Sequence, residues 1–451
     1  MAERVMSPIE REVGEVFERV RGIGGGKLAS YIPELGKADE EAFGLAVCTA
    51  DGFTAGLGDA DQEFTIQSIS KPFVYGLALA THGREDVDAY IDVEPSGEAY
   101  NELSVHPESG RPLNAMINAG AIAASSLVPG RTVEERIDAV VSLLSSYAGR
   151  QLELDQGVLD SETQSSYRNR AIAYMLRAHD MIACDPDEAL AVYLAQCAVK
   201  VTCEDLAAMG AVLANGGVQP RTGEPILEPD VLRRMLSVMA TCGMYDGAGN
   251  WLTDVGMPAK SGVSGGIMGV LPGQLAVAVF SPMLNDHGNS VRGVAAFTEL
   301  SREFGLHIFD RPRGTTRTLR RQIPLAKAEE LDPGLAQALQ EQEEDATLYV
   351  LQGDIHVAGL QSLAEAMAEE PESTAKLVID TSEAGAITEQ AKDEIRRLAE
   401  HYVSPEREVV VVDADPQDRE LAESVGMKAF PTLDEAAAWC AGEDPSEAPA
   451  G

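Results

Sequence analysis

A serine and a lysine separated by two residues constrain this chain more than any other feature. The segment Gln67-Ser68-Ile69-Ser70-Lys71-Pro72 follows a strand-like run and opens an apolar stretch with helical spacing. Side chains at positions i and i+3 of a helix are neighbours, so we expect the Lys71 amine within hydrogen-bond reach of the Ser68 hydroxyl. A serine becomes a good nucleophile when a nearby base takes its proton. Lysine can be that base only if burial or positive charge lowers its pKa from about 10.4.

A second element of the same chemistry appears much later, at Lys260-Ser261-Gly262. Lys-Ser/Thr-Gly at a strand edge is typical of serine-lysine acyl-transfer enzymes, where it lies opposite the nucleophile. One of its backbone N–H groups then joins the N–H of the nucleophile in an oxyanion hole. A glycine-rich bend between two strands explains the same residues, so the two motifs alone leave both interpretations open.

Length and composition indicate a globular protein of two domains. The chain has 451 residues, of which 45% are hydrophobic and 24% are charged, and this is too long for one ordinary core. No run approaches the roughly 18 apolar residues of a membrane span. The first residues carry no apolar core of the kind that a secretory signal needs, so we expect a cytoplasmic protein.

The charge of the chain is extreme, at −38. Such a surface repels nucleic acid and anionic membranes, so neither is an expected partner. Because salt screens the self-repulsion of like charges, we expect a protein that tolerates high salt. The six cysteines include no Cys-x-x-Cys pair, so they indicate buried thiols and neither a zinc site nor a disulfide framework.

Strand patterns at both ends of the first 310 residues bracket a helical middle. Phe43–Thr49, an Asp51-Gly52 turn and Phe53–Leu57 predict a β-hairpin. From Pro107 to about 245 the spacing is helical, with a capping box at Thr202-Cys203-Glu204-Asp205. Strands are expected again at Pro258–Val263, Gly266–Leu271 and Gln274–Phe280, before a closing helix over Asn289–Phe304. The fold class is therefore α+β, an antiparallel sheet plus a helical lobe, with Ser68 between them.

The rest of the chain has a different character. Five arginines lie within residues 311–321, and we expect 311–345 to be a linker. Short apolar strands then alternate with amphipathic helices, which predicts a small α/β domain over 346–441. Residues 341–451 hold 27 acidic and 7 basic side chains, so this end carries the denser charge. The final segment, 442–451, is expected to be disordered.

At this point the sequence resembles a family, the serine-dependent glutaminases with a β-lactamase-like, penicillin-binding-protein-like fold. The resemblance covers roughly 25–310 and implies hydrolysis of L-glutamine to L-glutamate and ammonia, with no cofactor and no metal, in a homodimer or homotetramer. Nine segments carry it: Tyr31-Ile32-Pro33-Glu34-Leu35, Ile66-Gln67-Ser68-Ile69-Ser70-Lys71, Glu94-Pro95-Ser96-Gly97, Ile117-Asn118-Ala119-Gly120-Ala121-Ile122, Arg168-Asn169-Arg170-Ala171, Gln196-Cys197-Ala198, Cys242-Gly243-Met244-Tyr245-Asp246, Pro258-Ala259-Lys260-Ser261-Gly262-Val263 and Gly288-Asn289-Ser290-Val291.

The resemblance also implies roles for single residues. Ser68 would form a γ-glutamyl ester, Lys71 would activate it, and Tyr245 would relay protons to the leaving ammonia and from water. The N–H groups of Ser68 and Val263 would hold the oxyanion. The remaining matched residues would bind substrate, with Tyr31 as a lid residue: Tyr31, Asn118, Glu162, Asn169 and Tyr193.

The C-terminal domain resembles the STAS fold of anti-sigma-factor antagonists and sulfate-transporter tails. The resemblance rests on Tyr349-Val350-Leu351-Gln352-Gly353-Asp354 and Leu377-Val378-Ile379-Asp380-Thr381-Ser382. The serine that some members phosphorylate would fall near Ile387-Thr388-Glu389-Gln390, where this chain has none. A docking or stabilising role is therefore expected instead of phosphorylation control.

Two other functions remain open at the level of sequence. A penicillin-binding or β-lactamase-type hydrolase would share the fold, but it would need a Ser-x-Asn motif and a wide cleft. A catalytically silent scaffold would signal through its C-terminal domain, but such a chain would be free to lose Ser68, Lys71 and Tyr245, and all three are present.

Overall fold

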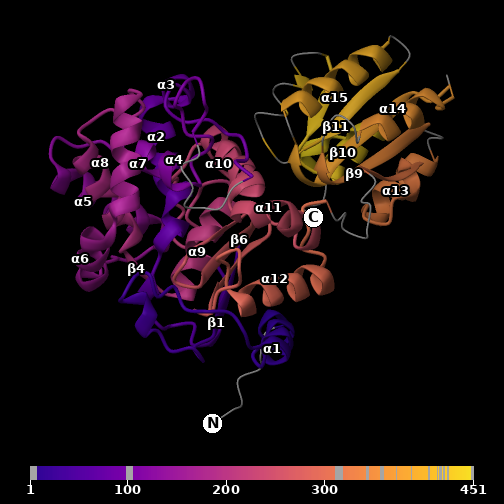
Figure 1. The fold of residues 1–451 in the computed structure, drawn as a ribbon. Helices are drawn as coiled ribbons and strands as arrows, with labels where there is room; N and C mark the ends of the chain where they lie inside the picture. The colour runs from indigo at the N-terminus through magenta and orange to yellow at the C-terminus, as the bar shows by residue number, and fades with distance from the viewer. Residues whose placement is uncertain are drawn as a thin grey trace. The chain divides into compact units, whose positions relative to one another are not determined.

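The computed structural model divides the chain into two compact units, residues 1–310 and 311–451. It describes residues 8–97, 105–309, 318–341, 345–355, 360–371, 373–387, 389–404, 407–413, 415, 419, 422–423 and 426–447. The two units are treated separately below, and they are coloured indigo to orange and orange to yellow in Figure 1.

The first unit is built on one five-stranded antiparallel sheet, in the order β2-β1-β7-β6-β5. The predicted hairpin forms its edge, since β1 (Gly44–Thr49) pairs with β2 (Thr54–Gly58). On its other side β1 pairs with β7 (Leu275–Phe280), with Thr49 opposite Leu275. The late strands β6 (Gly266–Leu271) and β5 (Ala259–Ser261) complete the sheet. The early hairpin and the late strands thus share one sheet, as predicted.

Side chains alternate between two cores, one on each face of this sheet. Leu45 and Val47 of β1 pack with α1 (Pro8–Val20) and α12 (Val291–Phe304), which lie beside each other in Figure 1. Ala46 and Cys48 face the opposite way, toward α9 (Cys203–Ala214). Because successive side chains of a strand point to opposite faces, both faces of a fully covered sheet are apolar.

The helical lobe packs on the α9 side and contains the predicted middle of the chain. A short pair of strands, β3 (Phe64–Thr65) and β4 (Lys200–Val201), joins two of its loops. The lobe's other helices are α2 (Lys71–His82), α3 (Arg84–Asp88), α4 (Asn118–Ser126), α5 (Val133–Ala148), α6 (Gln156–Ser165), α7 (Tyr167–Ala178), α8 (Pro186–Cys197) and α10 (Pro229–Cys242). The helix α11 (Ala248–Asp254) packs in the other core, with α1 and α12.

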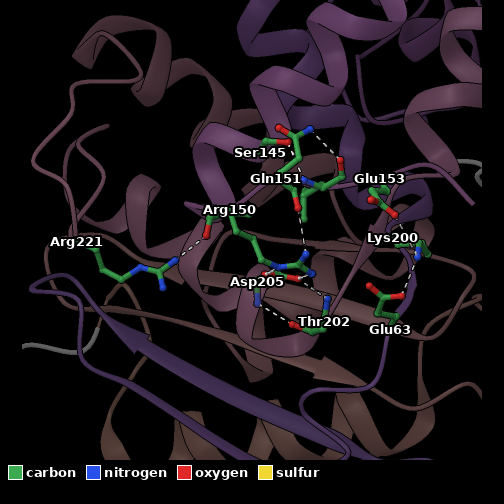
Figure 2. Close-up of polar contacts among 11 residues, drawn as sticks. Glu63, Ser145, Arg150, Gln151, Glu153, Lys200, Thr202, Asp205 and Arg221 are labelled. Atoms are coloured by element: carbon green, nitrogen blue, oxygen red, sulfur yellow. Dashed lines mark hydrogen bonds and ion pairs between the residues drawn. The ribbon is translucent and has the colours of Figure 1, made fainter.

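The predicted capping box of α9 is present and belongs to a larger polar network (Figure 2). Thr202 Oγ1 accepts from the Asp205 N–H at 3.1 Å, and the Asp205 carboxylate accepts from the Thr202 N–H at 2.8 Å. Arg150 donates two further hydrogen bonds to the same carboxylate, at 2.7 and 2.5 Å. This bidentate pair ties the loop after α5 to the start of α9.

The second unit is a mixed sheet in the order β12-β11-β10-β9-β8. The strands β9 (Ala346–Ile355), β10 (Lys376–Ile387), β11 (Glu408–Val412) and β12 (Lys428–Phe430) are parallel to one another. The helices α14 (Gln361–Ala368) and α15 (Glu389–Tyr402) cover one face, and α13 (Pro333–Glu341) and α17 (Leu433–Cys440) cover the other. These elements form the predicted small α/β domain.

The predicted linker over 311–345 is wrong for most of its length. Within these bounds β8 (Leu319–Pro324) pairs antiparallel with β9, and α13 packs on the sheet. Apolar residues explain the difference, because Leu325, Leu335 and Leu339 are buried in the core of the second unit. The expected disordered tail, 442–451, includes a short 3₁₀ helix at Pro445–Glu447, and residues 448–451 lie outside the described part.

The cysteines are free thiols, and Cys184 is half-buried, whereas the sequence indicates that all six are buried. Among the described residues we find no helix that combines the length and the apolar character needed to cross a membrane.

Candidate functional site

Ser68 lies in a tight 3₁₀ turn, Gln67–Ser70, that leads directly into α2. The sequence predicts that Ser68 and Lys71 share one α-helix, whereas α2 begins at Lys71 and Ser68 precedes it. The turn is held by Ser70, whose Oγ donates to the Gln67 carbonyl at 2.7 Å. Gln67 has a φ of 50°, a left-handed conformation that is uncommon for a residue other than glycine. Ser68 is therefore presented from a strained, fixed turn.

Lys71 is buried behind Ser68, at 1% exposure. Among the described interactions its ammonium donates to Asn118 Oδ1 at 2.7 Å and to the Met116 carbonyl at 3.2 Å, and not to Ser68. Burial lowers the pKa of Lys71 to about 8, against a smaller opposing effect of Cys197. A lysine in this state supplies an appreciable fraction of free amine near neutral pH.

A cavity of about 160 Å³ opens in front of Ser68. Its walls come from separate parts of the first unit, which meet only in the folded chain. Seven of the predicted site residues line it: Tyr31, Ser68, Asn118, Glu162, Asn169, Tyr193 and Val263. Lys71 and Tyr245 are not among the lining residues.

Glu162, on α6, is the acidic group of the cavity. Its Oε1 accepts a hydrogen bond from Gln67 Nε2 at 2.7 Å. Burial raises the pKa of Glu162 to about 7, and the bond from Gln67 opposes this shift. A buried carboxylate with one neutral donor is poised to take a cationic partner, because a positive charge would restore its ionised form.

Two asparagines continue the chain of contacts that starts at Lys71. Asn118 accepts from Lys71, and its Nδ2 donates to Asn169 Oδ1 at 2.9 Å. These bonds fix the orientation of both amides, so that each amide nitrogen still offers an N–H for a further acceptor. Tyr193 packs nearby, with its ring centroid 5.9 Å from Lys71 Nζ. Burial first, then Cys197 and Glu162, raise the pKa of Tyr193, so its hydroxyl is a neutral donor.

Tyr245 is held from two sides at the start of a 3₁₀ turn, Tyr245–Gly247. Its Oη donates to the Ser261 carbonyl at 3.1 Å, and its φ of 56° is left-handed. Lys260 Nζ lies 3.9 Å from the centroid of its ring and donates to the same carbonyl at 2.8 Å. Burial, and then the proximity of Lys71, keep the pKa of Lys260 well below its ordinary value.

Val263 follows β5 at a bend that brings its backbone toward the Ser68 turn. Gly262 makes the approach possible, because a Cβ at this position would lie 2.9 Å from the Ile66 carbonyl oxygen. The bend is closed by hydrogen bonds from Gly262 N–H to Gly266 and from Gly265 N–H to Gly262. The Lys260-Ser261-Gly262 motif is thus both a strand edge and a bend beside the nucleophile.

Comparison with protein families agrees with this geometry. The family profile described as glutaminase matches residues 26–309. The chain belongs to the glutaminase family. This match spans the sheet, the helical lobe and the residues around the cavity, and solved members with the same arrangement have the β-lactamase-like fold that the sequence predicts.

Individual glutaminases are similar over longer stretches. A glutaminase of Corynebacterium efficiens is 45% identical over 377 residues, which cover 83% of this chain and 85% of that protein. One of Corynebacterium glutamicum is 51% identical over 303 residues, with coverage of 67% and 73%. A crystal structure of Mglu has a TM-score of 0.77 and 39% identity, and covers 94% of this chain and 98% of that one. Further Mglu structures include a glutamate form and one in the presence of 4.3 M NaCl.

Several cavity residues of this glutaminase were missed by sequence reasoning. Gln67 had a signal, since it precedes Ser68 in a quoted motif, and Arg168 stands next to Asn169 in another. Ile32 likewise stands next to Tyr31 in a quoted motif, whereas Ser165 and Ser166 reach the cavity at the junction of α6 with α7. No spacing in the sequence reveals such positions, because they depend on how separate elements pack.

Proposed function

We propose that this member of the glutaminase family hydrolyses L-glutamine to L-glutamate and ammonia through a γ-glutamyl ester on Ser68. One observation carries the proposal. A single cavity holds a serine backed by a buried lysine, together with a carboxylate and several neutral donors that suit the two charged ends of a free amino acid.

Substrate recognition follows from the chemistry of the cavity walls. The substrate ammonium would pair with Glu162, and this contact would lower the pKa of a carboxyl that burial holds at about 7. The substrate carboxylate would accept from the amides of Asn118 and Asn169 and from the Tyr193 hydroxyl. Tyr31, at the rim of the cavity and 55% exposed, would cover the bound amino acid.

Acylation would begin when the unprotonated amine of Lys71 takes the proton of the Ser68 hydroxyl. Ser68 Oγ then bonds to the amide carbon of the side chain of glutamine, and the carbonyl electrons move to the oxygen. The N–H groups of Ser68 and Val263 would hold this oxyanion. When the oxyanion collapses, the carbon–nitrogen bond breaks, and a proton delivered through Tyr245 and Lys71 allows ammonia to leave.

Deacylation would run the same steps with water. Tyr245 and Lys71 would take a proton from the water, its oxygen would attack the ester carbonyl, and the proton would return to Ser68 Oγ as glutamate forms. The double restraint on Tyr245, from the Ser261 carbonyl and the Lys260 side chain, supports a role that needs a fixed hydroxyl.

The wider setting is also part of the proposal. The charge of −38 and the Mglu structure in 4.3 M NaCl support activity at high salt. We further propose a cytoplasmic homodimer or homotetramer, and a STAS-like second unit that docks or stabilises. The parallel strands β9 to β12, with helices on both faces, support an α/β fold of that kind.

The test is ammonia release from L-glutamine by the wild type and by Ser68→Ala, at low salt and at molar NaCl. We expect release by the wild type at both salt concentrations and a loss of at least about a thousandfold in the variant. Rapid quenching should trap a γ-glutamyl group on Ser68. Hydrolysis of nitrocefin without release of ammonia from glutamine would contradict the proposal and favour a lactam hydrolase.

A further inference from the structure

The segment 23–41 brings two side chains to the cavity without belonging to either core of the first unit. Tyr31 and Ile32 both line the cavity. Ile32 packs in a small separate cluster with Ala29, Val263 and Leu284. Ile32 of this segment therefore packs with Val263, whose N–H is the proposed oxyanion donor. The position of the segment thus affects the geometry around Ser68.

The segment needs restraint from elsewhere, because its own sequence provides little. It begins within a glycine-rich stretch, Gly22-Ile23-Gly24-Gly25-Gly26, which has many accessible backbone conformations. Its regular structure is limited to one 3₁₀ turn, Leu35–Lys37, and to an isolated bridge between Lys27 and Leu284.

Arg292, in the first turn of α12, contacts both ends of this segment. The side chain is 8% exposed. Its Nε donates to the Ile23 carbonyl at 3.0 Å, at the beginning of the segment. Its Nη1 donates to the Glu40 and Glu41 carbonyls at 3.3 and 3.2 Å, at the end. One planar guanidinium thus joins two points of the backbone that are far apart along the chain.

The fourth contact of Arg292 is of a different kind. Its Nη2 lies 3.1 Å from Glu41 Oε2, but the Glu41 side chain is 86% exposed. Ion pairs with exposed partners contribute little, whereas charge-assisted bonds from a buried guanidinium to carbonyl groups are strong. The backbone contacts, and not the ion pair, are therefore expected to hold the segment.

We propose that Arg292 is a positioning residue: it forms hydrogen bonds with both ends of segment 23–41 and so sets the position of Tyr31 and Ile32 over the glutamine site. The inference rests on the proposed function, since it concerns how that site binds its substrate. Arg292 does not line the cavity, so it acts through the segment.

The experiment compares Arg292→Met, Arg292→Lys and the matched control Glu41→Gln, which loses the ion pair but keeps the carbonyl groups. Steady-state kinetics with L-glutamine give kcat and KM, and hydrogen–deuterium exchange follows peptides from 23–41 and from β6 and β7. For Arg292→Met we expect about a tenfold rise in KM, with kcat changed less than KM, and faster exchange confined to 23–41. Arg292→Lys should fall between, and Glu41→Gln should match the wild type.

Two results would overturn the proposal. One is unchanged KM and unchanged exchange in 23–41 for both Arg292 variants. The other is faster exchange throughout the first unit with an unchanged KM, which would mean a general structural role. If the wild type released no ammonia, the proposed function would fail, while the exchange measurement, which needs no turnover, would still decide whether Arg292 holds the segment.

Discussion

The two units of this chain differ in the charged side chains that they bury. The first unit buries five charged side chains in its described part, and three of them, Lys71, Lys260 and Glu162, have pKa values shifted strongly, mainly by burial. The other two, Asp205 and Arg292, hold parts of the fold together. In the described part of the second unit, the buried charged residue is Asp380, whose carboxylate accepts from the Ser382 N–H. Burying ionisable groups costs stability, so a fold accumulates them where chemistry needs them. The shifted pKa values of Lys71, Lys260 and Glu162 therefore support the proposal that catalysis belongs to the first unit.

The largest difference in activity is expected between two variants that each replace one lysine, Lys71 in the first unit or Lys376 in the second. Lys71→Met is expected to lower kcat by about a thousandfold or more, because it removes the proposed base and leaves Asn118 Oδ1 without its donor. The matched variant is Lys376→Met in the second unit, where the lysine also lies over an aromatic ring, that of Trp439, and donates to the Cys440 carbonyl. Ammonia release should be normal there. Equal losses in the two variants would erase the contrast between the units.

The pH dependence should report the two shifted groups of the cavity. In the proposed mechanism Lys71 must be unprotonated and Glu162 ionised, and their pKa values are about 8 and about 7. Log kcat/KM is therefore expected to rise with a slope near 1 between pH 7 and 8 and to steepen below pH 7. A flat profile from pH 6 to 8 would show that these groups do not control the reaction.

Glu162→Gln should raise stability while it weakens binding. Burial raises the pKa of this carboxyl from 4.5 to about 7, so its contribution to stability is complete below pH 4.5 and is lost as the pH rises through 7. At pH 8 the variant should gain about 3 kcal/mol of unfolding free energy, and at pH 5 about 1 kcal/mol or less. The same change should raise KM for L-glutamine about a hundredfold. Thermal unfolding at both pH values, beside the kinetics, checks both halves.

Asp205→Ala should have the opposite effect to Glu162→Gln: it should lower stability and leave substrate binding unchanged, because this buried carboxylate stabilises the fold. The change removes the carboxylate that accepts from the Thr202 N–H in the capping box of α9 and from Arg150, and should cost about 2 kcal/mol of unfolding free energy with KM unchanged. Asp155→Ala, which removes only the cap of α6, is the control and should cost about 1 kcal/mol. Chemical denaturation measures both. A large rise in KM for Asp205→Ala would link this network to the site.

The smallest change in activity is expected from the largest change to the chain, the deletion of the second unit. Removing residues 312–451 takes away the second unit, and none of the described cavity residues around Ser68 comes from it. The remaining chain should fold and keep kcat/KM within about twofold. If a folded truncation lost all activity, the second unit would be part of the catalytic assembly.

Much of the fold could be predicted because its signals are local. The Asp51-Gly52 turn and the capping box at Thr202 each fix an element through neighbouring residues. The linker prediction failed because charged residues and prolines interrupt the apolar residues of 323–339, whose role is evident only when they pack on the second sheet. Local pattern does not report such long-range burial.

The candidate site shows the same limit. Ser68 and Lys71 are visible from their spacing, but the actual partner of Lys71 is Asn118, which comes from another helix. Likewise Arg292 looks like an ordinary helix residue in the sequence, and its contacts with Ile23 and Glu40 require α12 to lie beside the N-terminal segment. Contacts of this kind depend on tertiary structure.

The pairing of β1 with β7 has a consequence for how the protein is made. The two strands are separated by roughly 230 residues, which a ribosome adds in about 10 to 45 seconds at ordinary rates. During that time the edge of β1 that pairs with β7 in the folded protein has no partner, and β1 carries apolar side chains on both faces. An unpaired apolar edge is a site for aggregation. Synthesis of this chain is therefore expected to depend on chaperones that cover the nascent hairpin until β7 has emerged.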